Sequence, residues 1–151
     1  MKRSFFLTVL LVAGLFTSLT SFAPRQLPGL VEDILNHTNK FRKSHRLDEL
    51  IMKSDLNSIA QKHSENMARG RTGFGHTGFD QRFAQARKSI YGIHTFGENV
   101  AYGVSTGKSV VNMWSKSPPH RKNLLGKYRY IGIGVAKDRR GRLYYTQVFA
   151  N

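Results

Sequence analysis

Cysteine is absent from the sequence. Disulfides therefore cannot stabilise the protein, and neither thiol catalysis nor a zinc site built from cysteine is open to it. The fold must be held by a packed hydrophobic core, and residues 24–151 are long enough to form one such core. We therefore predict one domain over residues 24–151.

Long apolar runs are also scarce, and the only one lies near the N-terminus. An uncharged stretch from Phe5 to Leu19 follows two cations, and the small residues Ser21 and Ala23 come next. This order is typical of a secretory signal peptide, and a helix of about fifteen residues would span only ~22 Å of a hydrocarbon core of ~30 Å. We predict a signal peptide over residues 1–23, cleaved near Ala23, and a secreted, periplasmic or cell-envelope protein with no membrane span after cleavage. A retained N-terminal anchor is the alternative.

Acidic residues are few. The chain has 24 Lys and Arg but only 9 Asp and Glu, so its formal net charge is +15. Such a charge attracts anionic partners, and the lipids and glycans of a cell envelope are the candidates. The alternative is that the charge serves solubility or weak adhesion alone. Nucleic-acid binding is disfavoured, since the sequence has no recognised nucleic-acid motif and no aromatic platform for single strands. We expect a monomer.

Hydrophobic periodicity predicts four helices and then a β-hairpin. The expected helices cover residues 30–46, 54–70, 80–89 and 105–116, and the expected strands cover residues 130–137 and 143–149. Ser54 and Asp80 are the expected N-caps of the second and third helices. Helices first and strands last predict an α+β fold with helices stacked on an antiparallel sheet. Gly132 and Gly134 leave one face of the first strand bare, which lets another backbone approach closely.

Two residues of the expected helices are assigned to the core. His63 lies on the apolar stripe of the second helix, where a structural histidine with local hydrogen-bond partners is more common than a ligand. Trp114 shares its face of the fourth helix with Val110, so we expect it to be buried.

Glu98 is the only acidic residue between Asp80 and Asp138. It lies in the glycine-bounded segment 92–103, and we expect it on a loop or at the end of an element. One interpretation is structural: Glu98 pairs with a lysine or arginine, or accepts backbone N–H bonds. The other is functional and joins Glu98 to two histidines that also lie beside glycine or proline, His76 and His120.

Imidazole and carboxylate groups are suitable ligands for zinc, and the same set could transfer protons. The spacing alone does not show that these residues converge, because the sequence has no H-E-x-x-H and no histidine pair at i, i+4. Their assignment to one site therefore needs more than the spacing.

The order of motifs resembles the CAP superfamily (cysteine-rich secretory proteins, antigen 5 and pathogenesis-related 1) in its bacterial, SCP-like form. The matching segments cover nearly all of residues 24–151 in family order: "LNHTNKFRKSHRLDEL", "IAQKHSENMARG", "FGHTGFDQRF", "GENVAYG", "VVNMWSKSPPHRKNLL", "IGIGVA" and "YYTQVFA". The resemblance implies a three-layer α-β-α sandwich with helices on both faces of the sheet and a large surface cleft.

In this family the cleft is lined by two histidines and two acidic residues that bind a divalent metal, often zinc. The resemblance makes His76 and His120 the metal ligands, with Glu98 as the first acid. The second acid is expected one turn beyond Trp114, where this chain has no acidic residue. Ser117 is the expected substitute in that place, and Asn99 is expected beside Glu98 in the cleft.

Three functions are open at this point. A non-catalytic binding module would hold an envelope lipid, glycan or peptide in the cleft, with a metal on the two histidines. A metal-assisted hydrolase would use Glu98 as general base, and a serine mechanism with Ser117 and His120 lacks the expected motif. A purely structural envelope domain would have no active cleft. The missing second acid favours binding over catalysis, and no residue is firmly assigned a catalytic role.

Overall fold

The computed structural model describes residues 27–151. The predicted signal peptide, residues 1–23, lies outside the described residues. Within the described part of the chain, no helix is both long and apolar enough to cross a membrane. Helices and strands follow one another in this part in the order α1 (Pro28–Ser44), β1 (Ile51–Met52), α2 (Ser54–Ala68), α3 (Phe79–Ser89), β2 (Phe96–Tyr102), α4 (Gly107–Lys116), α5 (Pro118–Leu124), β3 (Tyr130–Lys137) and β4 (Leu143–Ala150).

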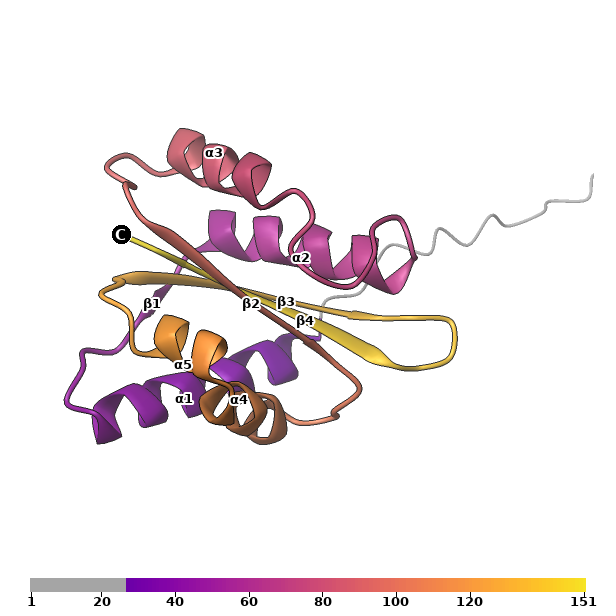
Figure 1. The fold of residues 1–151 in the computed structure, drawn as a ribbon, viewed down its shortest axis with the longest axis horizontal. Coiled ribbons are helices and arrows are strands. Elements are labelled where there is room, and N and C mark those ends of the chain that lie inside the picture. The colour runs from indigo at the N-terminus through magenta and orange to yellow at the C-terminus, as the bar shows by residue number, and fades with distance from the viewer. Residues whose placement is uncertain (1–26) are drawn as a thin grey trace, which may run out of the picture.

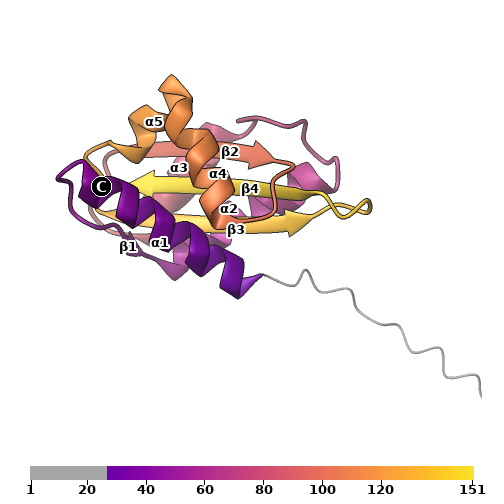
Figure 2. The same ribbon diagram turned by 90° about the horizontal axis from the view of Figure 1, so that it is seen from below.

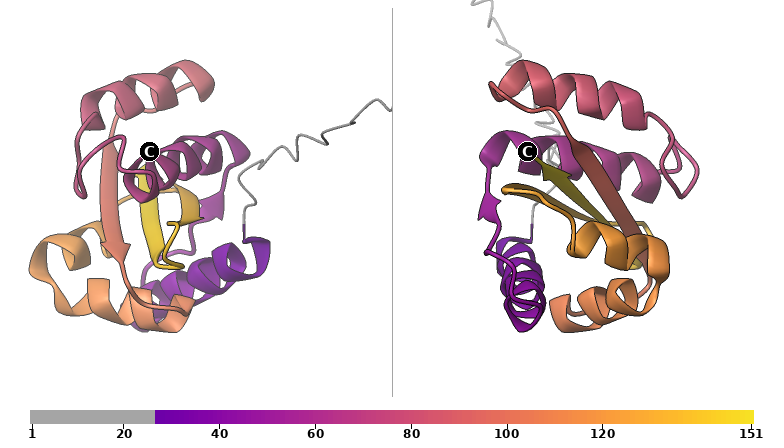
Figure 3. Two further views of the ribbon diagram at one scale, coloured as in Figure 1. Left: turned by 90° about the vertical axis from the view of Figure 1, so that its right-hand side faces the viewer. Right: turned by 60° about the vertical axis from the view of Figure 1, so that its left-hand side comes forward.

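These elements form three layers, as Figure 1 shows. The middle layer is a four-stranded sheet in the order β1-β3-β4-β2. The helices α2 and α3 cover one face of the sheet, while α1, α4 and α5 cover the other, which is the nearer face in Figure 2. The end views in Figure 3 show the same layering. The predicted α+β class and α-β-α sandwich are thus confirmed. The sheet is not wholly antiparallel, however, because the short β1 pairs with β3 in parallel.

Alternation of side chains along the strands divides the apolar residues between two cores. The larger core lies between the sheet and the α1–α4 layer and contains Trp114 and Phe149. The smaller core lies between the sheet and the α2–α3 layer and contains Leu56 and Val148. Trp114 is fully buried, and its Nε1 donates to the carbonyl oxygen of Val100 at 3.1 Å, which confirms its predicted place in the core.

Helix α2 lies directly against the backbone of β3. A Cβ atom at Gly132 would collide with Leu56, and one at Gly134 would collide with the backbone of Ala60 and Gln61. Only glycine permits this separation between a helix and a strand. The close approach predicted from these two glycines is therefore confirmed, and α2 supplies the partner.

The same helix completes the hydrogen bonding of β3 beyond the end of β1. The side-chain oxygen of Asn57 accepts the backbone N–H of Ile133 at 2.8 Å, and that of Gln61 accepts the N–H of Val135 at 3.0 Å. The two acceptors are four residues apart and so lie on one face of the helix. Without them, buried N–H groups at this strand edge would lose their partners, which costs about 1–3 kcal/mol each.

The N-caps of two helices differ from the prediction, by one residue in α2 and by two in α3. Ser54 is the first residue of α2 and not its N-cap, which is Lys53. Helix α3 begins at Phe79, one residue before Asp80, and its N-cap is Gly78. Gly78 has a φ of 83°, a turn conformation that glycine adopts readily, so the chain enters the helix earlier than the aspartate suggested.

Two residues expected on loops or at element ends lie within regular elements. Glu98 lies in the strand β2, opposite Val148 of β4, because residues 96–102 pair along their whole length with β4. His120 lies in α5, which begins directly after Ser117 with Pro118. Proline ends a preceding helix but fits the first turn of the next, where no helical partner exists for the missing N–H.

We expect Gly134→Ala to lower the free energy of unfolding by ~1–3 kcal/mol or more, because the added methyl group must push α2 away from β3. Gly73→Ala is the matched control, since a Cβ atom there meets nothing within 4 Å. The control should change stability by no more than about 0.5 kcal/mol. Chemical denaturation measures both, and equal stabilities of the two variants would contradict the close packing of α2.

Candidate functional site

His76, Glu98 and His120 come from three separate parts of the fold. His76 lies in the loop between α2 and α3, Glu98 in β2 and His120 in α5. The structure places Nδ1 of His76 at 2.8 Å from Oε1 of Glu98. His120 is attached to the neighbouring position of β2, because Nδ2 of Asn99 donates to its carbonyl oxygen at 3.2 Å.

Glu98 is held chiefly by Arg82 of α3. Arg82 donates from Nε to Oε2 at 2.6 Å and from Nη2 to Oε1 at 2.7 Å, a two-point contact that is among the strongest charge-assisted hydrogen bonds. The side chain of Glu98 is fully buried. The structural interpretation of Glu98 as an ion-pair partner is therefore confirmed, and the pair fastens α3 to the sheet.

His63 of α2 is a further residue of this network. It is 2 % exposed, and its Nε2–H donates a hydrogen bond to the carbonyl oxygen of Gly75 at 2.9 Å, because a carbonyl oxygen can only act as acceptor. Burial lowers the pKa of His63, the charge of Arg82 lowers it further, and Glu98 opposes both effects. His63 thus fixes the loop that carries His76, and its predicted structural role is confirmed.

His120 is half-buried and bonded to the residue that separates α4 from α5. Its Nδ1 lies 2.8 Å from Oγ of Ser117. Burial lowers the pKa of His120, and the nearby His76 lowers it further. Both effects favour the neutral imidazole, which is the form that binds metal ions.

Two asparagines fix the position of α5 on β2. Asn99 is fully buried, and its side-chain oxygen accepts from Nδ2 of Asn123 at 2.9 Å. The same Nδ2 lies 2.9 Å from the carbonyl oxygen of Glu98. Asn99 therefore sets the position of His120 relative to Glu98 from within the protein.

Arg42 of α1 is a further positioning residue that sequence reasoning missed. It is 3 % exposed, and its guanidinium donates to the carbonyl oxygens of Asp48 at 2.8 Å and of Leu124 and Gly126 at 2.9 Å each. Burial lowers the pKa of Arg42, and Asp48 opposes that effect. The contacts hold the chain between α5 and β3. In a sequence with 24 basic residues, nothing distinguishes this arginine from those at the surface.

The two histidines predicted as metal ligands each use one ring nitrogen for a contact within the protein. Across residues 27–151, no three His, Cys, Asp or Glu side chains gather as a metal-binding group. His76 and His120 use Nδ1 for contacts within the protein, and in the described part of the chain no residue hydrogen-bonds to their Nε2 atoms. Each histidine thus has one ring nitrogen that could ligate a metal ion, and two such nitrogens are fewer than the three protein ligands of catalytic zinc sites.

The three-layer fold, with histidines from the α2–α3 loop and α5 beside a glutamate in the sheet, defines a domain of the CAP type. Residues 35–149 match the CAP family, described as the cysteine-rich secretory protein family. The chain belongs to this family, as its motifs predicted.

Two similar proteins come from Bacillus subtilis (strain 168). The uncharacterized membrane protein YlbC is 33 % identical over 123 residues, which are 78 % of this chain and 33 % of that protein. The uncharacterized protein YkwD is 29 % identical over 125 residues, which are 81 % of this chain and 48 % of that protein. The chain thus spans less than half the length of either relative.

Solved structures also resemble this fold. An outer surface protein from Borrelia burgdorferi has a TM-score of 0.74 at 20 % identity, and the match covers 85 % of this chain and 98 % of that one. An extracellular protein containing an SCP domain from Bacillus anthracis has a TM-score of 0.70 at 30 % identity, over 82 % of this chain and 41 % of that one. The first likeness shows the fold alone.

We expect Arg82→Met to lower the free energy of unfolding by ~3–5 kcal/mol, because it leaves a buried carboxylate without its two-point partner. Lys43→Ala is the control: it breaks an ion pair with Glu49 in which the side chains are 68 % and 56 % exposed, and should cost no more than ~1 kcal/mol. Adding Glu98→Gln to Arg82→Met should restore part of the loss, since a neutral amide needs no counter-charge. Urea denaturation of the wild type and these three variants checks this, and equal costs for the two single variants would refute it.

Stability should also fall on mild acidification. The pKa of His63 is lowered on folding, so the unfolded chain takes up a proton more readily, and stability is lost as the pH drops from the ordinary value of 6.5 through the lower folded pKa. His63→Gln can still donate to Gly75 but cannot titrate, and its thermal midpoint should fall less between about pH 7.5 and pH 5.5. His94→Gln, at an exposed position, should keep the wild-type pH dependence. Identical pH dependence in all three proteins would exclude this role of His63.

Proposed function

We propose that this chain is a secreted or cell-envelope CAP domain that acts as a binding module and not as an enzyme. The observation that carries the proposal is the state of Glu98, the residue that a hydrolase of this kind would need as general base. Its side chain is fully buried, and both oxygens accept hydrogen bonds from Arg82, with His76 on Oε1 as well. A general base must reach the proton of an incoming water, which this arrangement opposes.

Export is supported by the predicted signal peptide and by the similarity to an extracellular protein with an SCP domain. The high positive charge supports anionic envelope components, lipid or glycan, as partners. A lipid, glycan or peptide of the envelope is the ligand class we propose for the site around the two histidines.

Within this module, His76 and His120 are the residues that would hold zinc or another divalent ion through Nε2. The fit rests on the contacts of the ring nitrogens that would not bind the metal. A carboxylate that is hydrogen-bonded to that second nitrogen fixes the ring and raises its basicity. Glu98 has this relation to Nδ1 of His76. Ser117 has the corresponding relation to Nδ1 of His120, as a weaker partner. An ion with only two protein ligands would offer its remaining positions to oxygen or nitrogen atoms of a bound molecule.

Zinc calorimetry on the purified protein tests this assignment. We expect one zinc per chain, and binding that is weaker by about tenfold or more in His76→Ala and in His120→Ala, because each removes one of two nitrogen ligands. His94→Ala is the matched control, since that histidine is exposed and lies outside the site. Equal affinity in all four proteins would refute the metal site.

A separate measurement tests the non-catalytic part of the proposal. The wild-type protein should hydrolyse no member of a panel of ester, peptide and glycoside substrates above the background rate. Turnover that disappears in Glu98→Gln, while the variant keeps its thermal midpoint, would overturn the proposal in favour of the hydrolase.

A further inference from the structure

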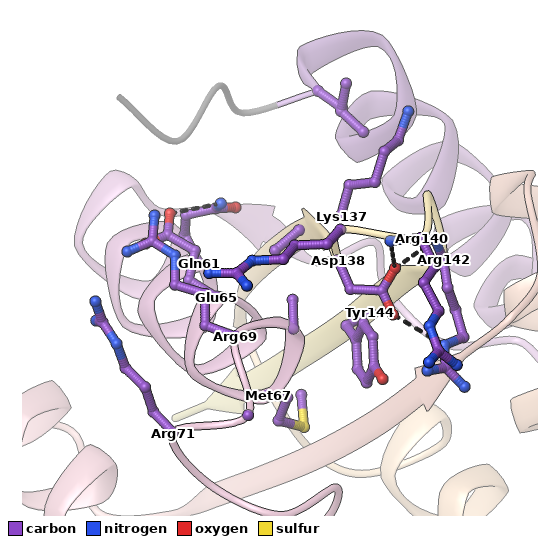
Figure 4. A pocket seen from close by; sticks show the side chains of 15 residues that line it. Gln61, Glu65, Met67, Arg69, Arg71, Lys137, Asp138, Arg140, Arg142 and Tyr144 are labelled. Atoms are coloured by element: carbon purple, nitrogen blue, oxygen red, sulfur yellow. Dashed lines mark hydrogen bonds and ion pairs between the residues drawn. The ribbon is translucent and has the colours of Figure 1, made fainter. Parts of the chain in front are cut away.

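A hollow of about 1320 Å³ lies between the end of α2 and the β3–β4 hairpin, as Figure 4 shows. It is strongly basic, although it also contains Glu65 and Asp138. The basic residues that line it come from both sides: Arg69, Arg71, Lys137, Arg139, Arg140 and Arg142.

Of the two acids in the hollow, Asp138 is paired with a cation and Glu65 is hydrogen-bonded to a neutral amide. The hairpin binds Asp138 through the backbone N–H groups of Arg140 and Arg142, each at 2.9 Å, and through Nε of Arg142 at 3.1 Å. Glu65 accepts a hydrogen bond from Gln61 at 2.9 Å. Several cations remain whose side chains make no ion pair or hydrogen bond with another residue of the described range 27–151: Arg69, Arg71, Lys137, Arg139 and Arg140.

This hollow is separate from the site around the histidines. Glu98 pairs with Val148, whereas the hairpin end of β4 is at Leu143. Five residues of strand correspond to about 17 Å. None of His76, Glu98 and His120 lines the hollow.

We propose that the hollow binds an anionic glycan chain through its sulfate, phosphate or carboxylate groups. The cations are mostly arginines, and the planar guanidinium matches two oxygens of such a group at once. The volume exceeds the ~300–1,000 Å³ that is usual for one small molecule, so several units of a chain can enter. The shape is concave, which suits a polymer better than the flat surface of a membrane. This site does not depend on the proposed metal site.

The aromatic residue in the hollow argues against nucleic acid. Tyr144 is stacked on Tyr102, with ring centroids 5.7 Å apart and an angle of 21° between the rings. The guanidinium of Arg142 lies over both rings, at 5.5 Å and 5.6 Å from their centroids. Proteins that bind single-stranded nucleic acid stack bases on free aromatic faces, and this tyrosine is already engaged.

Fluorescence anisotropy with labelled heparin, a sulfated glycan, tests the inference. We expect binding at low salt that weakens as salt rises, because exposed charges are screened. The triple variant Arg69→Ser, Arg71→Ser and Arg140→Ser should bind about tenfold more weakly, a change that three exposed ion pairs together can supply. If the thermal midpoint of the triple variant falls, the single variant Arg140→Glu should still bind heparin more weakly than the wild type.

The matched control removes the same number of charges elsewhere. It is the triple variant Lys40→Ser, Lys88→Ser and Lys108→Ser, whose lysines are exposed and lie outside the hollow. This variant should change the affinity for heparin less than about twofold. Equal losses in the two triple variants would overturn the inference, because binding would then follow net charge alone.

Three competitors complete the test. Oligothymidylate and phosphatidylglycerol vesicles should each compete more weakly than unlabelled heparin, and a stronger effect of either would overturn the choice of a glycan. A metal chelator should leave heparin binding unchanged, because the hollow contains neither histidine of the proposed metal site. If the chelator abolishes heparin binding, the glycan binds at the histidines and not in the hollow, and the inference is overturned.

Discussion

The close contact between α2 and β3 is the constraint on which the rest of this structure depends. Glycines at positions 132 and 134 let the helix backbone approach the strand, and side-chain oxygens of Asn57 and Gln61 then complete the hydrogen bonding of the strand edge. The helix cannot slide along the sheet without losing these bonds. Its position determines where His63 is buried and where the following loop, with His76, can reach the sheet.

The second constraint is the buried charge at Glu98. A carboxylate without solvent needs a partner, and Arg82 from α3 supplies two hydrogen bonds while His76 supplies a third. The contacts that offset the cost of burying Glu98 also orient His76, and they oppose a role for Glu98 as general base. Stability and the proposed binding function therefore come from one arrangement, and the hydrolytic alternative is weakened by it.

The two ends of the sheet carry different chemistry. Near Glu98, neutral imidazoles are favoured because burial lowers the pKa of both His63 and His120. At the hairpin, arginines from two elements surround a hollow whose two acids are already bonded. The two proposed sites, one for a metal ion and one for an anionic glycan, share no residue, so each can be tested without disturbing the other.

The sequence by itself determined the fold class, four of the five helices in the described residues, the hairpin, the buried place of Trp114 and the close approach at the two glycines, because each depends on local periodicity or on the lack of a side chain. Its motifs also predicted the family. The tertiary structure alone decided that Glu98 lies in a strand, that Arg82 and not another cation pairs with it, and that Arg42 and Asn123 hold α5. Such choices depend on which of many similar side chains the packing brings together, and composition or spacing does not contain that information.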